Sequence, residues 1–76
     1  MQKKHEITTL IDEWKPRRLL ADEIGANIAS VHKWAAANRI PSEWQGSVIK
    51  AAQAKGLDGV TADWMVAAHA RQSDAA

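Results

Sequence analysis

Proline and glycine residues divide this chain into short segments, which limits the secondary structure that each segment can form. Pro16, Gly25, Pro41 and Gly56 lie at the edges of stretches whose apolar residues recur with helical spacing. In the first stretch that spacing places four apolar side chains on one helical face, namely Ile7, Leu10, Ile11 and Trp14. Alanine is abundant and the β-branched residues are scattered, which favours helix over strand. The pattern therefore predicts an all-α domain.

Five helices are expected within a single domain that covers residues 1–76. The first carries the apolar face described above. The second and third span about residues 16–24 and 28–37. The fourth follows a cap at Ser42 and runs to about Lys55, and the last follows a cap at Thr61. The polar tail, about residues 72–76, is expected to be frayed.

Side chains that cap helices mark three of these starts. Asn27, Ser42 and Thr61 each precede a helical stretch, and residues of these types accept hydrogen bonds from the free amides of a first turn. Gln45 lies three residues after Ser42, which is the spacing of a capping box. At the other helix ends, Gly25 and Gly56 are expected to stop the helix because glycine tolerates a positive φ.

Size and composition narrow the class of protein. Seventy-six residues suffice for one small domain and favour a binding module over an enzyme. The chain has no cysteine, which excludes a disulfide scaffold and a zinc site with thiolate ligands. No apolar run reaches the roughly 18 residues of a membrane span, and no signal-peptide pattern opens the chain. We therefore expect an intracellular protein without a membrane partner.

Tryptophan supplies all the aromatic side chains, with four copies and neither Phe nor Tyr. Each indole can bury on the order of 150–250 Å², so a few of them can anchor a small core. Trp14, Trp34 and Trp64 fall on apolar faces and are expected inside. Trp44 lies in the first turn of its helix, where we expect it to be half-buried.

Positive charge is concentrated in the middle of the sequence. The whole chain carries a net charge of only +1. Residues 15–39, by contrast, contain five basic and two acidic side chains, which gives this segment a net charge of +3. A phosphate backbone responds to local charge, so this segment is the candidate for contact with nucleic acid.

Residues 17–37 have the spacing that two short helices joined by a tight turn require. Ala21 is small enough for a close helix crossing, and Gly25, four residues later, can adopt the positive φ of the turn. Val31 and Trp34 follow six and nine residues after that glycine and face the shared core. This pattern resembles the helix-turn-helix of the lambda-repressor/Cro-like DNA-binding family.

The similarity covers about residues 5–70. More narrowly, Arg39-Ile40-Pro41 followed by Trp44 and Val48-Ile49 resembles the phage-associated subgroup called carph-isopro domains. The resemblance implies a small five-helix lambda-repressor-like domain in a cytoplasmic protein encoded by a bacterium or a phage. One position departs from the family, because Ala26 is smaller than the aliphatic residue usual after the turn glycine.

The same resemblance implies a transcriptional regulator that binds an operator in double-stranded DNA. Residues 28–37 would be the recognition helix in the major groove. Its outward positions, expected at base edges, are Asn27, Ile28, Ala29, His32, Lys33 and Ala36. The residues expected to hold phosphates are Arg17, Arg18, Arg39 and Ser42. No cofactor, metal or catalytic residue is implied.

One recognition helix covers few base pairs, so a homodimer on a palindromic operator is expected. The last helix, through Trp64 and Met65, is the first candidate for the dimer surface. The sequence is also compatible with the DNA-binding antitoxin of a toxin–antitoxin pair, whose partner would be a toxin. It is further compatible with a protein-interaction module that kept the fold without DNA binding, or with a helical bundle that uses the alanine–glycine spacing for packing alone. In these last cases His32 would be a solvated surface histidine.

Enzyme activity is disfavoured because the candidate catalytic residues of this chain are badly placed relative to one another. Asp22, Ser30 and His32 are the residue types of a catalytic triad, but side chains two apart on a helix point about 200° away from each other. Nucleophile and base would therefore not meet. The three histidines lack the i, i+4 spacing of a helical metal site, and we expect His5 and His69 to be uninvolved.

Overall fold

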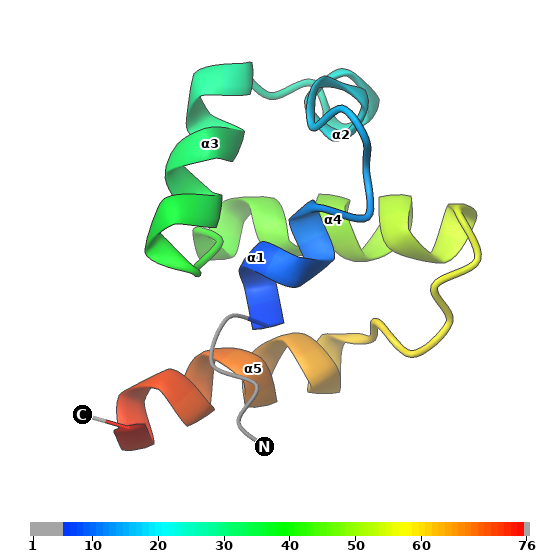
Figure 1. Ribbon diagram of the computed structural model, residues 1–76. Helices are drawn as coiled ribbons and strands as arrows, with labels where there is room; N and C mark the ends of the chain where they lie inside the picture. Colours follow the sequence, from blue (N-terminus) through cyan, green and yellow to red (C-terminus); the bar gives the residue numbers. More distant parts are fainter. Residues whose placement is uncertain (1–5, 76) are drawn as a thin grey trace.

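The computed structural model describes the backbone of residues 6–75 and the side chains of residues 6–70. Within that range the chain forms five helices and no strand (Figure 1), which confirms the predicted all-α class. The helices are α1 (Glu6–Ile11), α2 (Arg18–Ile24), α3 (Ile28–Ala37), α4 (Ser42–Ala54) and α5 (Ala62–Ala75). In the described part of the chain, no helix combines the length and the apolar character needed to cross a membrane.

α1 is shorter than its apolar spacing predicts. It ends at Ile11, and tighter turns follow. The Glu13 amide donates to the Leu10 carbonyl at 3.0 Å, and the next amide continues the pattern. Trp14 therefore lies beyond the helix, yet its side chain is 4% exposed. The apolar spacing predicted the buried face correctly, although the backbone departs from the helix before the last of the four side chains.

Two further boundaries differ from the prediction. α2 begins at Arg18, because residue 16 belongs to the preceding turn, in which the Pro16 carbonyl accepts a hydrogen bond from the Leu19 amide (3.0 Å). At the other end of the chain, α5 continues through Ala75, where the polar composition predicted a frayed tail. These last residues contain neither glycine nor proline, so none of them interrupts the helix. Residue 76 lies outside the described residues.

A residue with positive φ follows α2 and α3 directly, and another follows α4 after Lys55. These residues are Gly25 (φ 76°), Asn38 (φ 57°) and Gly56 (φ 94°). In each case the next amide donates to the carbonyl five residues back, at 2.9–3.0 Å, and so satisfies a carbonyl left free at the helix end. The predicted stops at the two glycines are confirmed, and Asn38 performs the same role without being a glycine.

Two of the three predicted N-terminal caps are present. Asn27 Oδ1 accepts a hydrogen bond from the Ala29 amide (2.8 Å) at the start of α3. Thr61 Oγ1 accepts one from the Trp64 amide (3.1 Å) at the start of α5. Both bonds satisfy amides that have no acceptor within the first turn of their own helix.

The predicted cap at Ser42 was wrong. Ser42 is the first residue of α4, so the helix begins one residue earlier than a cap at Ser42 requires. The residue before the helix is Pro41, whose backbone is extended (φ −56°, ψ 144°) and whose side chain makes no cap. Gln45 consequently forms no capping box. Its side-chain amide donates instead to the Ile40 carbonyl (2.8 Å), which ties α4 to the loop that precedes it.

One apolar core joins the helices. Its buried members are Ile7, Leu10, Ile11, Trp14, Leu20, Ala21, Val31, Trp34, Ala35, Ile40, Val48, Ala51, Ala52, Val60, Met65 and Ala68. Trp14 and Trp34 are therefore inside, as predicted, whereas Trp64 is only partly buried and packs against the core. Trp44 is half-buried, as predicted, because its ring lies 5.7 Å from that of Trp34 at an interplanar angle of 43°.

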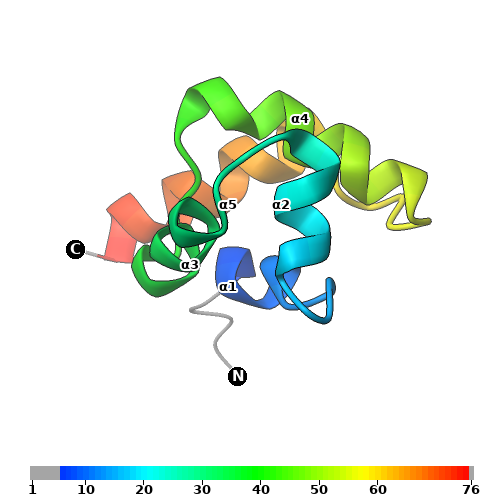
Figure 2. The ribbon, with the colours of Figure 1, turned by 90° about the horizontal axis from the view of Figure 1, so that it is seen from above.

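The packing leaves α3 at one side of the molecule. α1 packs against α3, α2 packs against both α3 and α4, and α5 packs against α4. Figures 1 and 2 show a short turn joining α2 and α3, with α1 beside α3. Ala26, the small residue after that turn, packs against the core. α3 thus has one side on the core and one side free of other helices.

Gly25→Ala is expected to lower the free energy of unfolding by about 1–2 kcal/mol, because an L residue is strained at φ 76°. No heavy atom lies within 4 Å of the position that its Cβ would take, so the cost is conformational rather than steric. Gly46→Ala is the matched control, since Gly46 lies within α4 in equally open space. That variant should gain about 0.5–1 kcal/mol. Denaturant titrations that gave both substitutions the same sign would contradict the turn geometry.

Candidate nucleic-acid interface

α3 has a buried side and an exposed side. Val31, Trp34 and Ala35 are buried in the core. The exposed residues of the helix are Ala29, His32, Lys33, Ala36 and Ala37. The solvent side of α3 therefore carries one cation and one imidazole among small alanines. Short side chains allow the helix backbone to approach a partner closely, while the two longer polar side chains can reach its functional groups.

The six side chains predicted at base edges do not all project from this surface. Ala29, His32, Lys33 and Ala36 are exposed, and so is Asn27. The Asn27 oxygen, however, already accepts the hydrogen bond that caps α3, so the paired contact with adenine that requires both amide atoms is not supported. The Asn27 amide nitrogen remains a donor.

The prediction that Ile28 points outward was wrong in part. Ile28 is partly buried and packs against the core. It lies three residues before Val31 and seven before Ala35, both of which are buried, and this spacing places all three on one side of the helix. Ile28 therefore serves mainly to pack the first turn of α3 against the core.

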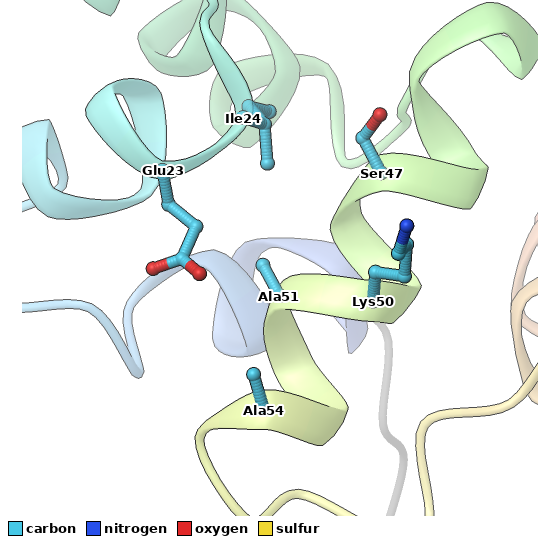
Figure 3. Close-up of a pocket in the computed structure, with 6 residues that line it drawn as sticks. All are labelled: Glu23, Ile24, Ser47, Lys50, Ala51 and Ala54. Carbon is cyan, nitrogen blue, oxygen red and sulfur yellow. The ribbon is translucent and has the colours of Figure 1, made fainter.

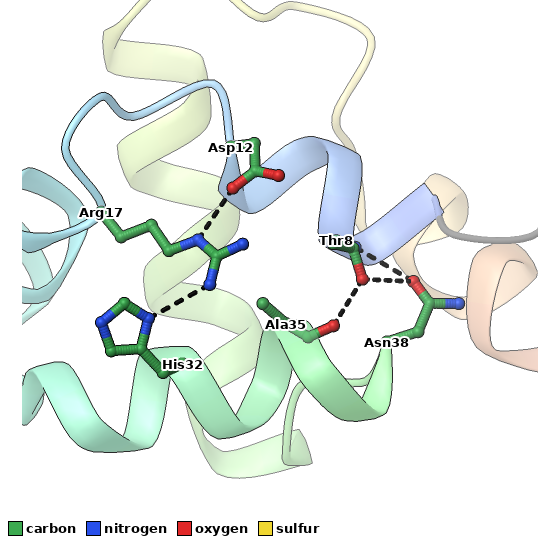
Figure 4. Close-up of polar contacts among 6 residues, drawn as sticks. All are labelled: Thr8, Asp12, Arg17, His32, Ala35 and Asn38. Carbon is green, nitrogen blue, oxygen red and sulfur yellow. Dashed lines mark hydrogen bonds and ion pairs between the residues drawn. The ribbon is translucent and has the colours of Figure 1, made fainter.

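Arg17 connects the turn before α2 to the exposed side of α3 (Figure 4). Its Nε donates to Asp12 Oδ1 at 2.8 Å, which is an ion pair, and its Nη1 contacts His32 Nδ1 at 3.1 Å. The Arg17 side chain is 29% exposed, so it lies along the surface rather than extending into solvent. Arg17 was predicted to contact a DNA phosphate. In the structure its guanidinium contacts His32 and is paired with the Asp12 carboxylate.

The other residues predicted at phosphates are exposed on elements next to α3. Arg18 is the first residue of α2, and Arg39 follows the residue that ends α3. Ser42 is the first residue of α4, where the free amides of a helix N-terminus favour an anion. Cations therefore lie at the start of α2, on α3 itself and just beyond the end of α3.

A shallow groove lies between α2 and α4 (Figure 3). It has a volume of about 320 Å³ and is lined by Glu23, Ile24, Ser47, Lys50, Ala51 and Ala54. Figure 3 shows Glu23 and Lys50 on the two sides of the groove, with apolar side chains between them. None of the residues predicted to contact DNA lines it.

Asn38 is a structural residue that the sequence did not reveal. Its Oδ1 accepts hydrogen bonds from the Ile7 amide (2.9 Å) and the Thr8 amide (3.0 Å), and the Thr8 hydroxyl contacts the same oxygen at 3.3 Å. The Thr8 hydroxyl also donates to the Ala35 carbonyl (Figure 4). Asn38 thus caps α1 from about 30 positions away while ending α3 with its own backbone. An asparagine after a predicted helix signals the second role but not the first.

His69 is a second such residue. It was expected to be uninvolved, yet its Nε2 accepts a hydrogen bond from the Ile40 amide (3.0 Å). Its Nδ1 lies 2.8 Å from the Met65 carbonyl, to which it donates, because a carbonyl can only accept. His69 therefore holds α5 against the loop between α3 and α4. His5 lies outside the described residues.

The burial of α5 does not fit the dimer surface predicted through Trp64 and Met65. Met65 is fully buried and cannot contact a second copy, and Trp64 is partly buried against the core. Met65 and Ala68 lie three residues apart and face inward together. Val66, at 65% exposure, is the large apolar side chain that α5 presents to solvent within the described residues.

Comparison of the chain with protein-family models, with curated proteins and with solved structures gave no match. The function must therefore be inferred from the side chains and their arrangement.

Proposed function

We propose that this protein is a transcriptional regulator that binds double-stranded DNA by placing α3 in the major groove. The observation that carries the proposal is the bihelical corner. α2 and α3 pack against each other across a left-handed Gly25, and α3 presents His32 and Lys33 among alanines on its exposed side. The major groove is about 12 Å wide and admits a helix. Small residues at Ala29 and Ala36 would allow α3 to enter it deeply.

The charges near α3 have the arrangement that this mode of binding needs. Lys33 can donate to guanine or to a phosphate from the middle of the exposed side. Arg18 and Arg39, on the neighbouring elements, can bind the DNA backbone and so fix the register of α3, with Ser42 and the first turn of α4 beside them. Because the net charge of the chain is only +1, affinity depends on this local group of cations.

Regulation through a palindromic operator fits the short recognition helix, which covers few base pairs. A homodimer would place two copies of α3 about 34 Å apart. The resemblance to lambda-repressor/Cro-like proteins, and to their phage-associated subgroup, supports a role in phage or bacterial gene control, in which occupancy of the operator blocks or recruits polymerase.

The groove between α2 and α4 favours a second candidate function, the binding of a protein partner such as the toxin of a toxin–antitoxin pair. Its apolar floor and oppositely charged sides suit a short amphipathic segment. Its volume of about 320 Å³ lies at the lower end for binding pockets, which run to roughly 1,000 Å³. We therefore prefer DNA as the main partner.

Selection from random duplex DNA tests the proposal, and Lys33→Ala is the first variant to compare. If Lys33 contacts a base, its loss should weaken binding to the selected operator by about 1–3 kcal/mol and relax the preference at one or two positions. Fluorescence anisotropy on the selected duplex and on single-base variants measures both effects. Failure of the parent protein to enrich any motif would refute sequence-specific binding.

Arg39→Ala is expected to act differently from Lys33→Ala. A lost phosphate contact should weaken binding to all duplexes alike and reduce the slope of log affinity against log salt by about 1 per protomer. Lys55→Ala removes the same charge and is the matched control. Lys55 directly follows the last residue of α4, and Figure 1 shows that end of α4 away from α3. Its Nζ lies 5.6 Å from the centre of the Trp14 ring. Equal salt slopes for the two variants would show that Arg39 does not contact the backbone.

A further inference from the structure

We propose that Arg17 is a positioning residue that holds His32 in one tautomer, so that His32 presents an N–H donor to a base edge. The inference rests on the proposed function for its DNA partner. Its structural basis is the chain of contacts from Asp12 through Arg17 to His32, which Figure 4 shows as two consecutive dashed lines. The first two residues flank the turn between α1 and α2, and the third lies on α3.

The tautomer follows from the chemistry of the guanidinium group. Arginine has five N–H donors, no acceptor, and a charge that it does not lose in proteins. The ring nitrogen that it contacts at 3.1 Å, Nδ1 of His32, must therefore be the acceptor. A neutral imidazole that accepts at Nδ1 carries its proton on Nε2. Figure 4 shows this second nitrogen on the side of the ring away from Arg17.

Asp12 determines which way the guanidinium points. Its carboxylate holds the Nε–H of Arg17 at 2.8 Å, and because the guanidinium is planar this contact fixes the directions of the remaining N–H groups. One of them then faces His32. Two of the five donors are engaged in these contacts, so three are left for a phosphate, and the phosphate role predicted for Arg17 is compatible with its role toward His32.

A fixed Nε2–H gives His32 a defined preference among bases. In the major groove guanine presents two acceptors, N7 and O6, whereas cytosine presents a donor from N4. His32 should therefore select guanine and reject cytosine on the strand that it faces. An imidazole free to change tautomer could instead accept from cytosine, and the discrimination would be lost.

Nuclear magnetic resonance on the free protein tests the first step. At alkaline pH, where the imidazole is neutral, the ¹⁵N shifts of His32 should show a proton on Nε2 and a bare Nδ1 in the parent. Arg17→Met keeps the aliphatic stem but removes the donors, and should shift His32 toward a mixture of both tautomers. Lys15→Met, an exposed position in the same turn, removes one charge and should leave the tautomer unchanged. A proton on Nδ1 in the parent, or the same tautomer population in parent and Arg17→Met, would overturn the proposal.

Operator selection with His32→Ala tests the second step. This variant should lose a preference of about 3- to 10-fold for guanine over cytosine at one position, the equivalent of one hydrogen bond. Arg17→Met should reduce that preference at the same position even where its thermal unfolding matches the parent. If the parent selects a duplex but His32→Ala leaves every position unchanged, or if the position favours cytosine, this inference fails while DNA binding stands. A parent that selects no duplex overturns both.

Discussion

Asn38→Ala is expected to lower the free energy of unfolding by about 3 kcal/mol, which is a large share of the stability of a domain of this size. The side chain is 8% exposed, and its oxygen accepts from the amides of Ile7 and Thr8 in the first turn of α1. Those amides have no acceptor within their own helix. Each buried donor left without an acceptor costs about 1–3 kcal/mol, less for the partly exposed one, and alanine is also strained at φ 57°.

Two variants separate the backbone role of Asn38 from the role of its oxygen. Asn38→Gly adopts the left-handed conformation without strain but removes the acceptor, so it should recover only about 1 kcal/mol of the loss. Asn38→Asp retains an acceptor oxygen at the positive end of α1 and should stay closest to the parent. Chemical denaturation and the exchange rates of the two α1 amides measure these effects. An alanine variant as stable as the aspartate variant would show that the capping bonds contribute nothing.

Trp34→Ala is expected to have the largest effect, a loss of about 3–5 kcal/mol that would leave the domain largely unfolded. Trp34 is 6% exposed, lies on the inner side of α3 and packs against Trp44 with ring centres 5.7 Å apart. Its removal leaves a cavity that adds to the cost of the lost burial, because the surrounding structure relaxes only partly.

Trp34→Phe and Trp44→Ala are the comparisons that make this result informative. Phenylalanine fills most of the space and should cost about 1–2 kcal/mol. Trp44 is half-buried, so its truncation should cost clearly less than that of Trp34. Circular dichroism during thermal and denaturant unfolding ranks the stabilities of these variants. Should Trp44→Ala prove more damaging than Trp34→Ala, the centre of the core would lie elsewhere.

The features that could be predicted from the sequence are those in which cause and effect lie within one helical turn. Asn27 and Thr61 cap the residues two or three positions after them. Gly25 ends α2 because its own φ is positive. The apolar spacing around Trp34 identified the buried side of α3, and the family resemblance implied the outward positions of His32 and Lys33, both of which are exposed.

The errors arose where a local signal competed with a neighbouring element. Ser42 and Gln45 have the spacing of a capping box, but α4 begins at Ser42 itself, directly after Pro41. The Gln45 side chain donates to the Ile40 carbonyl instead. The family resemblance placed Ile28 at a base edge, but Ile28 begins α3 and is partly buried against the core.

By itself, then, the sequence determined the all-α class, most of the helix ends and the solvent side of α3, because backbone conformation and apolar periodicity are properties of adjacent residues. Only the tertiary structure decided the pairs that join distant segments. These are Asn38 with the start of α1, His69 with the Ile40 amide, and Arg17 with His32. Such pairs depend on which helices cross and at what distance, and a hydrogen bond between positions 15 to 31 residues apart leaves no periodic trace in the chain.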